Sequence, residues 1–182
     1  MKLIIASDLH GSAYYGKKLI DRMAVEGAEK MLLLGDILYH GPRNDYPDAY
    51  DTKDLFAQLN DIKEKLICVR GNCDSEVDQM VLNFPIMSKH AMLFFDGITL
   101  MATHGHEYHI GNLPPLEEGN ILVYGHYHVP MCEEKDGVVC MNPGSVSLPK
   151  EGSAHSYIIY EDGKFTWKDL DGNPFMEYTR QV

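Results

Sequence analysis

Short apolar runs alternate with longer amphipathic segments in the first half of the chain. The runs are bounded by polar or glycine-containing sequence, as buried β-strands are, and they lie at residues 3–6, 31–34 and 66–69. Between them, residues 14–27 and 52–65 carry apolar side chains at helical spacing and are predicted to be amphipathic helices. The order strand, helix, strand, helix, strand is the α/β pattern of a largely parallel sheet.

The second half has a different pattern. Further apolar runs at residues 98–102 and 121–124 predict two more buried strands. Asp-Gly pairs favour the positive φ angles of tight hairpin turns, and they occur at Asp96-Gly97, Asp136-Gly137 and Asp162-Gly163. A second, more antiparallel sheet is therefore expected. Residues 39–51 are too rich in Pro, Gly and Asp for a helix, which predicts a surface loop inserted after a strand.

Composition narrows the class of protein. With 182 residues and 45% hydrophobic content, we expect one domain over residues 1–182, with the loop insertion near 39–51. The net charge of −11 disfavours a protein that follows duplex nucleic acid. Four cysteines without a C-x-x-C pair, and an N-terminus unlike a secretory signal, predict reduced thiols in the cytoplasm. No apolar stretch approaches the roughly 20 residues of a membrane span.

Polar residues of metal-binding type follow all five apolar runs. These segments are Asp8-Leu9-His10, Gly35-Asp36, Gly71-Asn72, His104-Gly105-His106 and Gly125-His126-Tyr127-His128. Sites in open α/β sheets are built at strand ends, because the strands fix the loops that carry the reactive groups. The sequence therefore predicts that these side chains meet at one site.

Carboxylate, imidazole and amide ligands without thiolate suit Mn, Fe, Zn or a similar divalent ion. Residues i and i+2 of an extended segment point the same way, so Asp8 with His10, and His126 with His128, can each address one site. Two ions that share a carboxylate would lie roughly 3.5 to 4 Å apart, close enough to hold a phosphate between them.

The ordered series of Asp8-x-His10, Gly35-Asp36, Gly71-Asn72, His104 and Gly125-His126-x-His128 resembles the metallophosphoesterase (calcineurin-like) superfamily, and most closely its small bacterial and archaeal phosphodiesterases of the YfcE type. The motifs span residues 8–128, and their joint occurrence in this order is specific. The resemblance implies an α/β (α+β) fold, a two-sheet αββα sandwich of mixed sheets flanked by helices. It also implies a hydrolase that acts on phosphoric diesters.

Carried over position by position, the resemblance implies two divalent cations, with Mn as the first choice and Ni, Co, Fe or Zn as alternatives. Asp8, His10 and His128 would hold the first, Asn72, His104 and His126 the second, and Asp36 would bridge both. The implied nucleophile is a metal-bridging hydroxide that attacks phosphorus in line, and Asn72 would also contact substrate.

One position departs from the family pattern. Many relatives have histidine as the general acid after Gly-Asn, but this chain has Cys73 in Gly71-Asn72-Cys73-Asp74. A thiol with an ordinary pKa near 8.5 could donate a proton but is a poor hydrogen-bond donor. His106, two residues after His104, is the alternative proton donor.

Other assignments stay open on sequence alone. Arg43 could reach over the metals to bind a substrate phosphate, or be a solvated loop arginine. The loop tyrosines Tyr39, Tyr46 and Tyr50 could stack on a base or aryl group, or pack the loop down. We expect a small-molecule phosphodiester as substrate and no membrane partner, with homo-oligomerisation possible. The alternatives are a metal-binding interaction scaffold of the same fold and a nuclease, which the acidic charge and the filled ligand positions disfavour.

Overall fold

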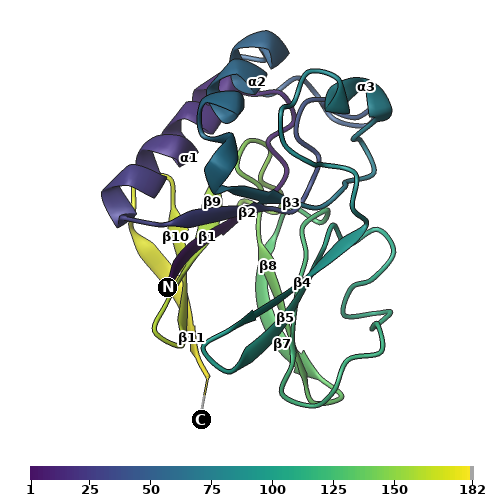
Figure 1. Ribbon diagram of the computed structural model, residues 1–182, viewed down its shortest axis with the longest axis vertical. Coiled ribbons are helices and arrows are strands. Elements are labelled where there is room, and N and C mark those ends of the chain that lie inside the picture. Colours follow the sequence, from purple (N-terminus) through teal and green to yellow (C-terminus); the bar gives the residue numbers. More distant parts are fainter. Residues whose placement is uncertain (181–182) are drawn as a thin grey trace.

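The computed structural model of the chain describes residues 1–180 and consists of two β-sheets packed face to face, with helices on the outer side of one of them (Figure 1). The six-stranded sheet has the spatial order β11 (Pro174–Thr179), β10 (Lys164–Asp169), β9 (Ser156–Glu161), β1 (Lys2–Ala6), β2 (Lys30–Leu33), β3 (Leu66–Cys68). Strands β1, β2 and β3 are parallel, which confirms the predicted start of the fold. The C-terminal strands add to this first sheet in antiparallel fashion.

The five-stranded sheet is also mixed. Its spatial order is β4 (His90–Phe95), β5 (Ile98–Thr103), β6 (Ile121–Val123), β8 (Val138–Pro143), β7 (Pro130–Lys135). The central strands β5, β6 and β8 are parallel, and the edge strands β4 and β7 are antiparallel to their neighbours. The second sheet is thus antiparallel only at its two edges, because the β4–β5 and β7–β8 hairpins contribute one edge strand each.

The three Asp-Gly hairpins are confirmed. Both residues of each pair have positive φ, with 49° and 70° at Asp96-Gly97, 51° and 76° at Asp136-Gly137, and 48° and 84° at Asp162-Gly163. These turns connect β4 to β5, β7 to β8 and β9 to β10. Two positive φ values in succession define the turn type that matches the twist of antiparallel strands, so the local sequence sets the register of all three hairpins.

Two helices cover the outer face of the six-stranded sheet. Ser12 caps the N-terminus of helix α1 (Ala13–Glu26), and its hydroxyl accepts a hydrogen bond from the Tyr15 amide at 3.3 Å. Helix α2 (Thr52–Asp61) begins at Asp51 and is followed by the 3-10 turn η1 (Lys63–Lys65), and the short helix α3 is Glu76–Gln79. Side-chain caps of this kind satisfy amides that the first helical turn leaves without partners.

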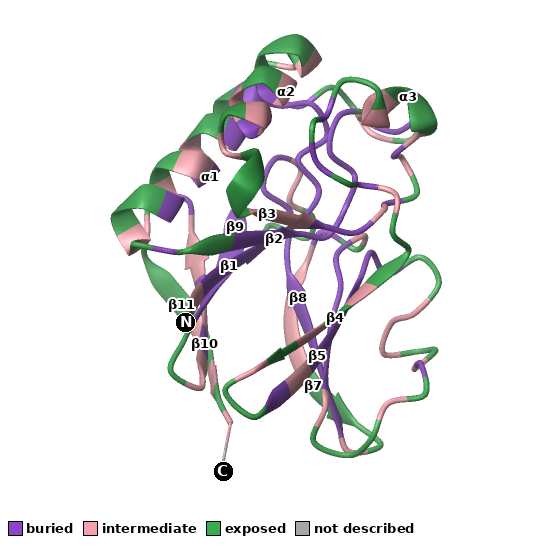
Figure 2. Cartoon of the chain, viewed as in Figure 1, coloured by how far each residue is buried: buried purple, intermediate pink, exposed green. Residues whose placement is uncertain are grey.

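The alternation of side chains along the central strands divides the core into two layers. In β1, Ile4 and Ala6 pack against the helices, whereas Leu3 and Ile5 pack against the second sheet. Buried residues therefore follow the inner strands and the helix faces turned toward them (Figure 2). Trp167 spans the space between the sheets, where its indole N–H donates to the carbonyl of Asn142 at 2.7 Å.

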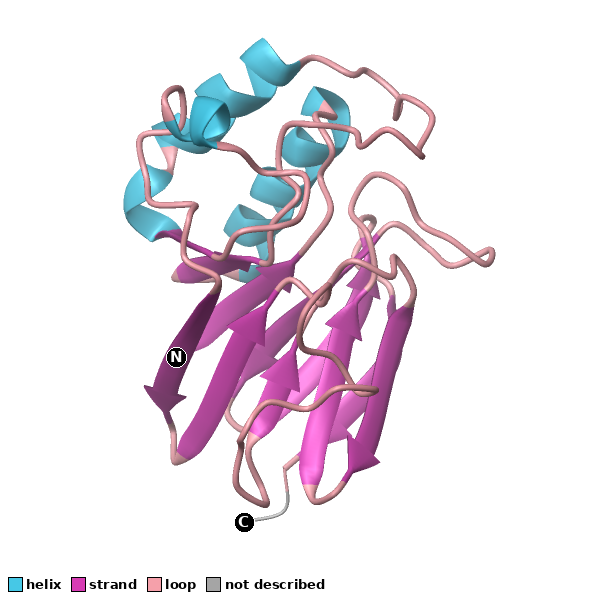
Figure 3. Cartoon of the chain, turned by 90° about the vertical axis from the view of Figure 1, so that its right-hand side faces the viewer, coloured by secondary structure: helices cyan, strands magenta, loops and turns pink. Residues whose placement is uncertain are grey.

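The predicted α/β fold with two mixed sheets is confirmed, but within residues 1–180 helices cover one outer face of the sandwich instead of two. No helix within residues 1–180 covers the outer face of the five-stranded sheet (Figure 3). The segment 104–120 packs Tyr108, Ile110 and Leu113 against that face instead. This segment contains three glycines and two consecutive prolines, which disfavour a helix. Within the described residues, none of the helices is long and apolar enough to span a bilayer.

Candidate metal centre

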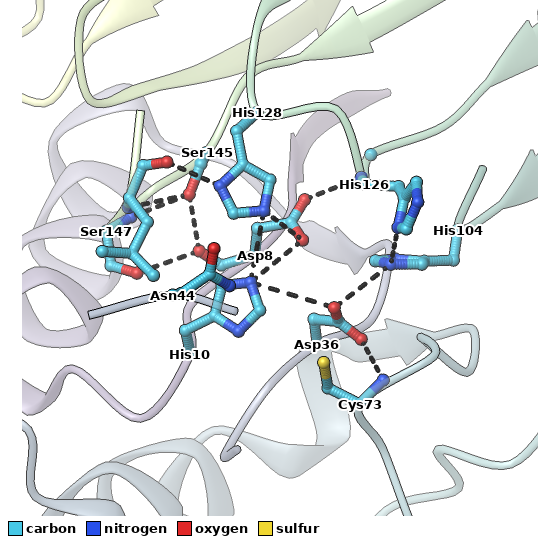
Figure 4. Close-up of polar contacts among 12 residues, drawn as sticks. Asp8, His10, Asp36, Asn44, Cys73, His104, His126, His128, Ser145 and Ser147 are labelled. Carbon is cyan, nitrogen blue, oxygen red and sulfur yellow. Dashed lines mark hydrogen bonds and ion pairs between the residues drawn. The ribbon is translucent and has the colours of Figure 1, made fainter. Parts of the chain in front are cut away.

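The loops after β1, β2, β5 and β6 meet at one edge of the two sheets. Backbone hydrogen bonds hold neighbouring loops together: the His10 amide donates to the Asp36 carbonyl at 2.9 Å, and the Gly125 amide donates to the His104 carbonyl at 2.8 Å. Six of the seven predicted ligands are labelled in Figure 4, which shows them turned toward a common centre. The structure therefore brings together residues that are up to 120 positions apart, from 8 to 128.

One group of ligands, here called the Asp8 cluster, consists of Asp8, His10 and His128. The Asp8 Oδ1 atom lies 3.4 Å from Nε2 of His10 and 3.3 Å from Nε2 of His128. The two Nε2 atoms are themselves 3.3 Å apart. All three side chains are buried.

The second group, here called the His104 cluster, consists of Asn72, His104 and His126. The His104 Nε2 atom lies 2.9 Å from Oδ1 of Asn72 and 3.3 Å from Nδ1 of His126. Asp36 lies between the groups, because its Oδ2 atom is 3.3 Å from Nε2 of His104 and 3.8 Å from Nε2 of His10.

The orientation of the imidazole rings suits cation binding. Three rings are anchored through Nδ1 to backbone carbonyls: His10 to Tyr39 at 2.8 Å, His104 to Leu34 at 2.7 Å, and His128 to Leu148 at 2.6 Å. A ring nitrogen that donates to a carbonyl holds its proton, so in a neutral ring the lone pair is on Nε2 and points to the centre.

The Asp8 cluster thus presents two ring nitrogens and one carboxylate oxygen to the same point. The buried Oδ1 of Asp8 accepts no hydrogen bond from the described residues, although a buried carboxylate oxygen without a partner is costly. A divalent cation would satisfy all three atoms at once, and nitrogen and oxygen donors are the ligands that such ions take in proteins. The residues present therefore fit a metal ion.

Several of these residues hold unusual backbone conformations. Positive φ angles occur at Asp8 (60°), His10 (46°), Asp36 (56°), His126 (68°) and His128 (62°). Residues other than glycine seldom adopt this region, and the strain persists only where the surrounding structure enforces it. Five of the seven predicted ligands share this feature, which marks the strand ends as a site built for function.

The charges of the cluster are strongly coupled. Burial opposes ionisation of Asp8, but its two imidazole partners outweigh burial and hold its pKa well below the usual value. The pKa of Asp36 is likewise lowered, against the effect of burial, by contact with His104. Burial would lower the pKa of His104, yet the carboxylates Asp36 and Asp8 raise it to about 9. Burial together with His104 lowers the pKa of His126 to about 4.

Asp74 fixes the backbone on either side of the Asp36 carboxylate. Its buried carboxylate accepts hydrogen bonds from the amides of Asp36 and Ile37, both at 2.8 Å, and of Gly71 at 2.7 Å. A Cβ atom at Gly71 would collide with the Asp36 carboxylate, so only glycine permits this approach. Asp74 was not among the predicted site residues, although it stands in the same Gly-Asn-x-Asp segment that marks the metal site.

The loop between β8 and β9 supports the Asp8 cluster. The hydroxyl groups of Ser145 and Ser147 both donate to the backbone carbonyl of Asp8, at 2.8 and 3.1 Å. The same loop supplies the Leu148 carbonyl that anchors His128. No motif in the sequence predicts these serines, because serine is common in loops and its short hydroxyl side chain has many other uses there.

A pocket of about 470 Å³ opens over the two clusters. Its lining consists of His10, Asp36, Gly41, Pro42, Arg43, Asn44, Asn72, Cys73, His126, Tyr127, His128 and Lys150. The lining includes the predicted Arg43 and Cys73, but not His106, which is exposed beside the His104 cluster with its ring centre 6.2 Å from that of His126. The loop tyrosines do not line it; Tyr46 packs on Tyr50 with ring centres 4.9 Å apart.

The sequence of residues 1–163 matches the calcineurin-like phosphoesterase superfamily domain. The chain belongs to this superfamily. It is therefore a metal-dependent phosphoesterase, a hydrolase of phosphate esters, and the resemblance inferred from the strand-end motifs is confirmed.

Individual relatives agree with this assignment. Phosphodiesterase YfcE of Escherichia coli K12 is 45% identical over 157 residues, which cover 86% of this chain and 85% of that protein. A solved structure of Yfce, described as a phosphoesterase from E. coli, superposes with a TM-score of 0.95 at 40% identity, covering 98% of this chain and 99% of the other. A predicted phosphoesterase from Streptococcus pneumoniae shares the fold at 24% identity, with a TM-score of 0.65 and coverage of 98% and 97%.

Proposed function

We propose that this superfamily member is a phosphodiesterase of small molecules, whose centre is formed by Asp8, His10, Asp36, Asn72, His104, His126 and His128. The observation that supports the proposal most directly is the meeting of Asp8 Oδ1, a buried oxygen without a hydrogen-bond partner among the described residues, with the Nε2 atoms of His10 and His128. The similarity to phosphodiesterase YfcE of E. coli supports the reaction class.

The side chains of the site would bind the cations and orient the substrate between them. Asp36 would contribute to both clusters, since its Oδ2 atom faces Nε2 of His104 at 3.3 Å and Nε2 of His10 at 3.8 Å. When bound, two divalent cations, with Mn as the first to test, would lower the pKa of water and balance charge on the phosphoryl oxygens. Arg43 and Asn72 line the pocket and would contact phosphate groups of the substrate.

Protonation of the leaving group is the step for which this chain lacks the usual histidine. Cys73 lines the pocket, and burial with the neighbouring Asp36 raises the pKa of its thiol, so the proton stays on sulfur at neutral pH. The pKa of His106 is lowered by burial and by His104, so this ring is mostly neutral at pH 7. Cys73 is therefore the better placed donor, but a weak one, which favours esters with acidic alcohols such as phenols.

Elemental analysis of purified protein together with hydrolysis assays tests the proposal. Bis(4-nitrophenyl) phosphate and 4-nitrophenyl phosphate would be compared across Mn, Ni, Co, Zn and Mg. We expect up to two divalent ions per chain and faster hydrolysis of the diester than of the monoester. Metal-loaded protein that leaves the diester intact, or prefers the monoester, would contradict the proposed function.

A further inference from the structure

Two positively charged side chains stand at the opening of the catalytic pocket. Arg43 comes from the inserted loop 39–51, and Lys150 comes from the loop between β8 and β9. Among residues 1–180, no acidic side chain forms an ion pair with either of them. Both cations are thus available in a chain whose net charge is −11.

Lys150 has a defined position relative to the metal centre. Its backbone amide donates to the carbonyl of His128 at 3.1 Å, two residues after Leu148 has accepted a hydrogen bond from the His128 ring. Its own carbonyl accepts a hydrogen bond from the Ser153 amide at 3.0 Å, which closes the turn. The backbone of Lys150 is therefore tied to a predicted metal ligand, so its side chain starts from a fixed point at the pocket edge.

A simple diester gives these cations little to bind. A diester of two uncharged alcohols has one negative charge, and the cation-binding clusters at the base of the pocket would take up the oxygens that carry it. Arg43 and Lys150 line the same pocket and are exposed to solvent, so they can contact a part of the substrate that extends out of the pocket. A second anionic group on that alcohol would meet them there, and charge-assisted hydrogen bonds to phosphate are among the stronger polar contacts.

We propose that Lys150, with Arg43, forms an anion-binding rim that makes the enzyme prefer diesters carrying a second phosphate on one of their alcohol groups. This inference rests on the proposed function and names the class of substrate that the site accepts. Lys150 is a specificity-determining residue in this scheme, because it contacts the second phosphate and not the reacting atoms.

Two matched substrates test the preference. The 4-nitrophenyl ester of thymidine 5′-phosphate and the same ester with an added 3′-phosphate share one leaving group and differ only in the second anion. For the Mn-loaded wild-type protein we expect kcat/KM to be about fivefold to tenfold higher for the 3′-phosphorylated ester, mainly through a lower KM, and the advantage to shrink at high salt. Equal kcat/KM values for the two esters would overturn the proposal.

Three variants assign the effect. Lys150→Gln should remove most of the advantage of the 3′-phosphorylated ester and leave the plain ester unchanged, whereas Lys150→Arg should retain it. Lys53→Gln is the matched control, because Lys53 is exposed on α2, does not line the pocket and loses the same charge. If Lys150→Gln slowed both esters equally, the lysine would serve the scissile phosphate, and the proposal would be wrong.

Equilibrium binding gives a readout independent of turnover. In calorimetric titrations, thymidine 3′,5′-bisphosphate should bind the wild type more tightly than thymidine 5′-phosphate, and Lys150→Gln should bind the two alike. Identical affinities in the wild type would refute the rim. Failure of the proposed function has a different signature, since the metal-loaded wild type would then hydrolyse neither ester.

Discussion

The Asp8 cluster and the His104 cluster have similar ligands but different surroundings. In the Asp8 cluster the three residues are at most 3% exposed, and both rings are anchored to carbonyls. In the His104 cluster only His104 has such an anchor, whereas Asn72 is exposed and the Nδ1 atom of His126 faces a neighbouring ring. The Asp8 cluster is therefore preorganised, whereas the side chains of the His104 cluster have to be ordered when a cation binds.

Anchoring determines how much order a metal ion has to create. Outer hydrogen bonds that fix the ring orientation strengthen binding, and buried ligands leave less freedom to lose. We therefore expect the Asp8 cluster to bind its cation more tightly, and the His104 cluster to hold a more readily exchanged one. Asp36, which faces both clusters, couples the two.

The largest effect should come from the residue that the clusters share. Asp36→Asn removes one negative charge from the space between them and should lower kcat by on the order of a thousandfold. Mn content, measured by elemental analysis, should fall for both ions. Asp61→Asn is the control, since Asp61 is exposed at the end of α2. Normal turnover of Asp36→Asn with full metal content would show that Asp36 is not the shared ligand.

Removal of one imidazole from each cluster tests whether the two clusters differ in cation affinity. We expect His10→Ala to weaken the tighter cation by about 100-fold, and His126→Ala to weaken the other by about tenfold while the tighter ion stays bound. Mn titrations by calorimetry measure both affinities. Equal losses, or a greater loss in His126→Ala, would reverse the assignment of the preorganised cluster.

The ligands could be predicted from the sequence, but the difference in preorganisation between the two clusters could not. Each predicted ligand follows an apolar run, and such motifs can be recognised because strand ends meet at one edge of a sheet. The anchors are different, because the carbonyls of Leu34, Tyr39 and Leu148 belong to the backbone and have no sequence signature. Ser145 and Ser147 reach Asp8 from more than 130 positions away, so only the fold brings them together.

The same limit applies to the fold. Hairpins at Asp96-Gly97, Asp136-Gly137 and Asp162-Gly163 were predictable because two adjacent residues determine the turn. Which sheet each hairpin joins depends on contacts distant in sequence, and the strands after residue 155 return to the first sheet. The covering of the second sheet by segment 104–120 was likewise not evident from local pattern.

In the metal-free protein, the charge pairing of His104 with Asp36 should make the free energy of unfolding depend on pH. The pKa of His104 rises from 6.5 to about 9 in the folded state, so its pairing with Asp36 stabilises the fold fully below pH 6.5 and is lost as the pH rises through 9. With chelator present, the free energy of unfolding in urea should fall by on the order of 2 kcal/mol over this window. Mn should abolish the fall, because the cation replaces the proton. His104→Gln should lack the slope, and an unchanged slope in that variant would assign it to other groups.

The smallest predicted effect concerns Cys73, which lies at the edge of both clusters. Its amide donates to Asp36 Oδ1 at 2.7 Å, and its thiol lies close to the ligand atoms of His10 and Asp36. Cys73→His would place a stronger proton donor there and should raise the rate on diesters with poor leaving groups, and on monoesters, by about tenfold or more. Rates on 4-nitrophenyl diesters should change little, since a phenolate leaves without help. Cys73→Ser separates loss of the thiol from gain of the imidazole, and an unchanged substrate profile in Cys73→His would show that proton donation at this position does not limit the range of substrates.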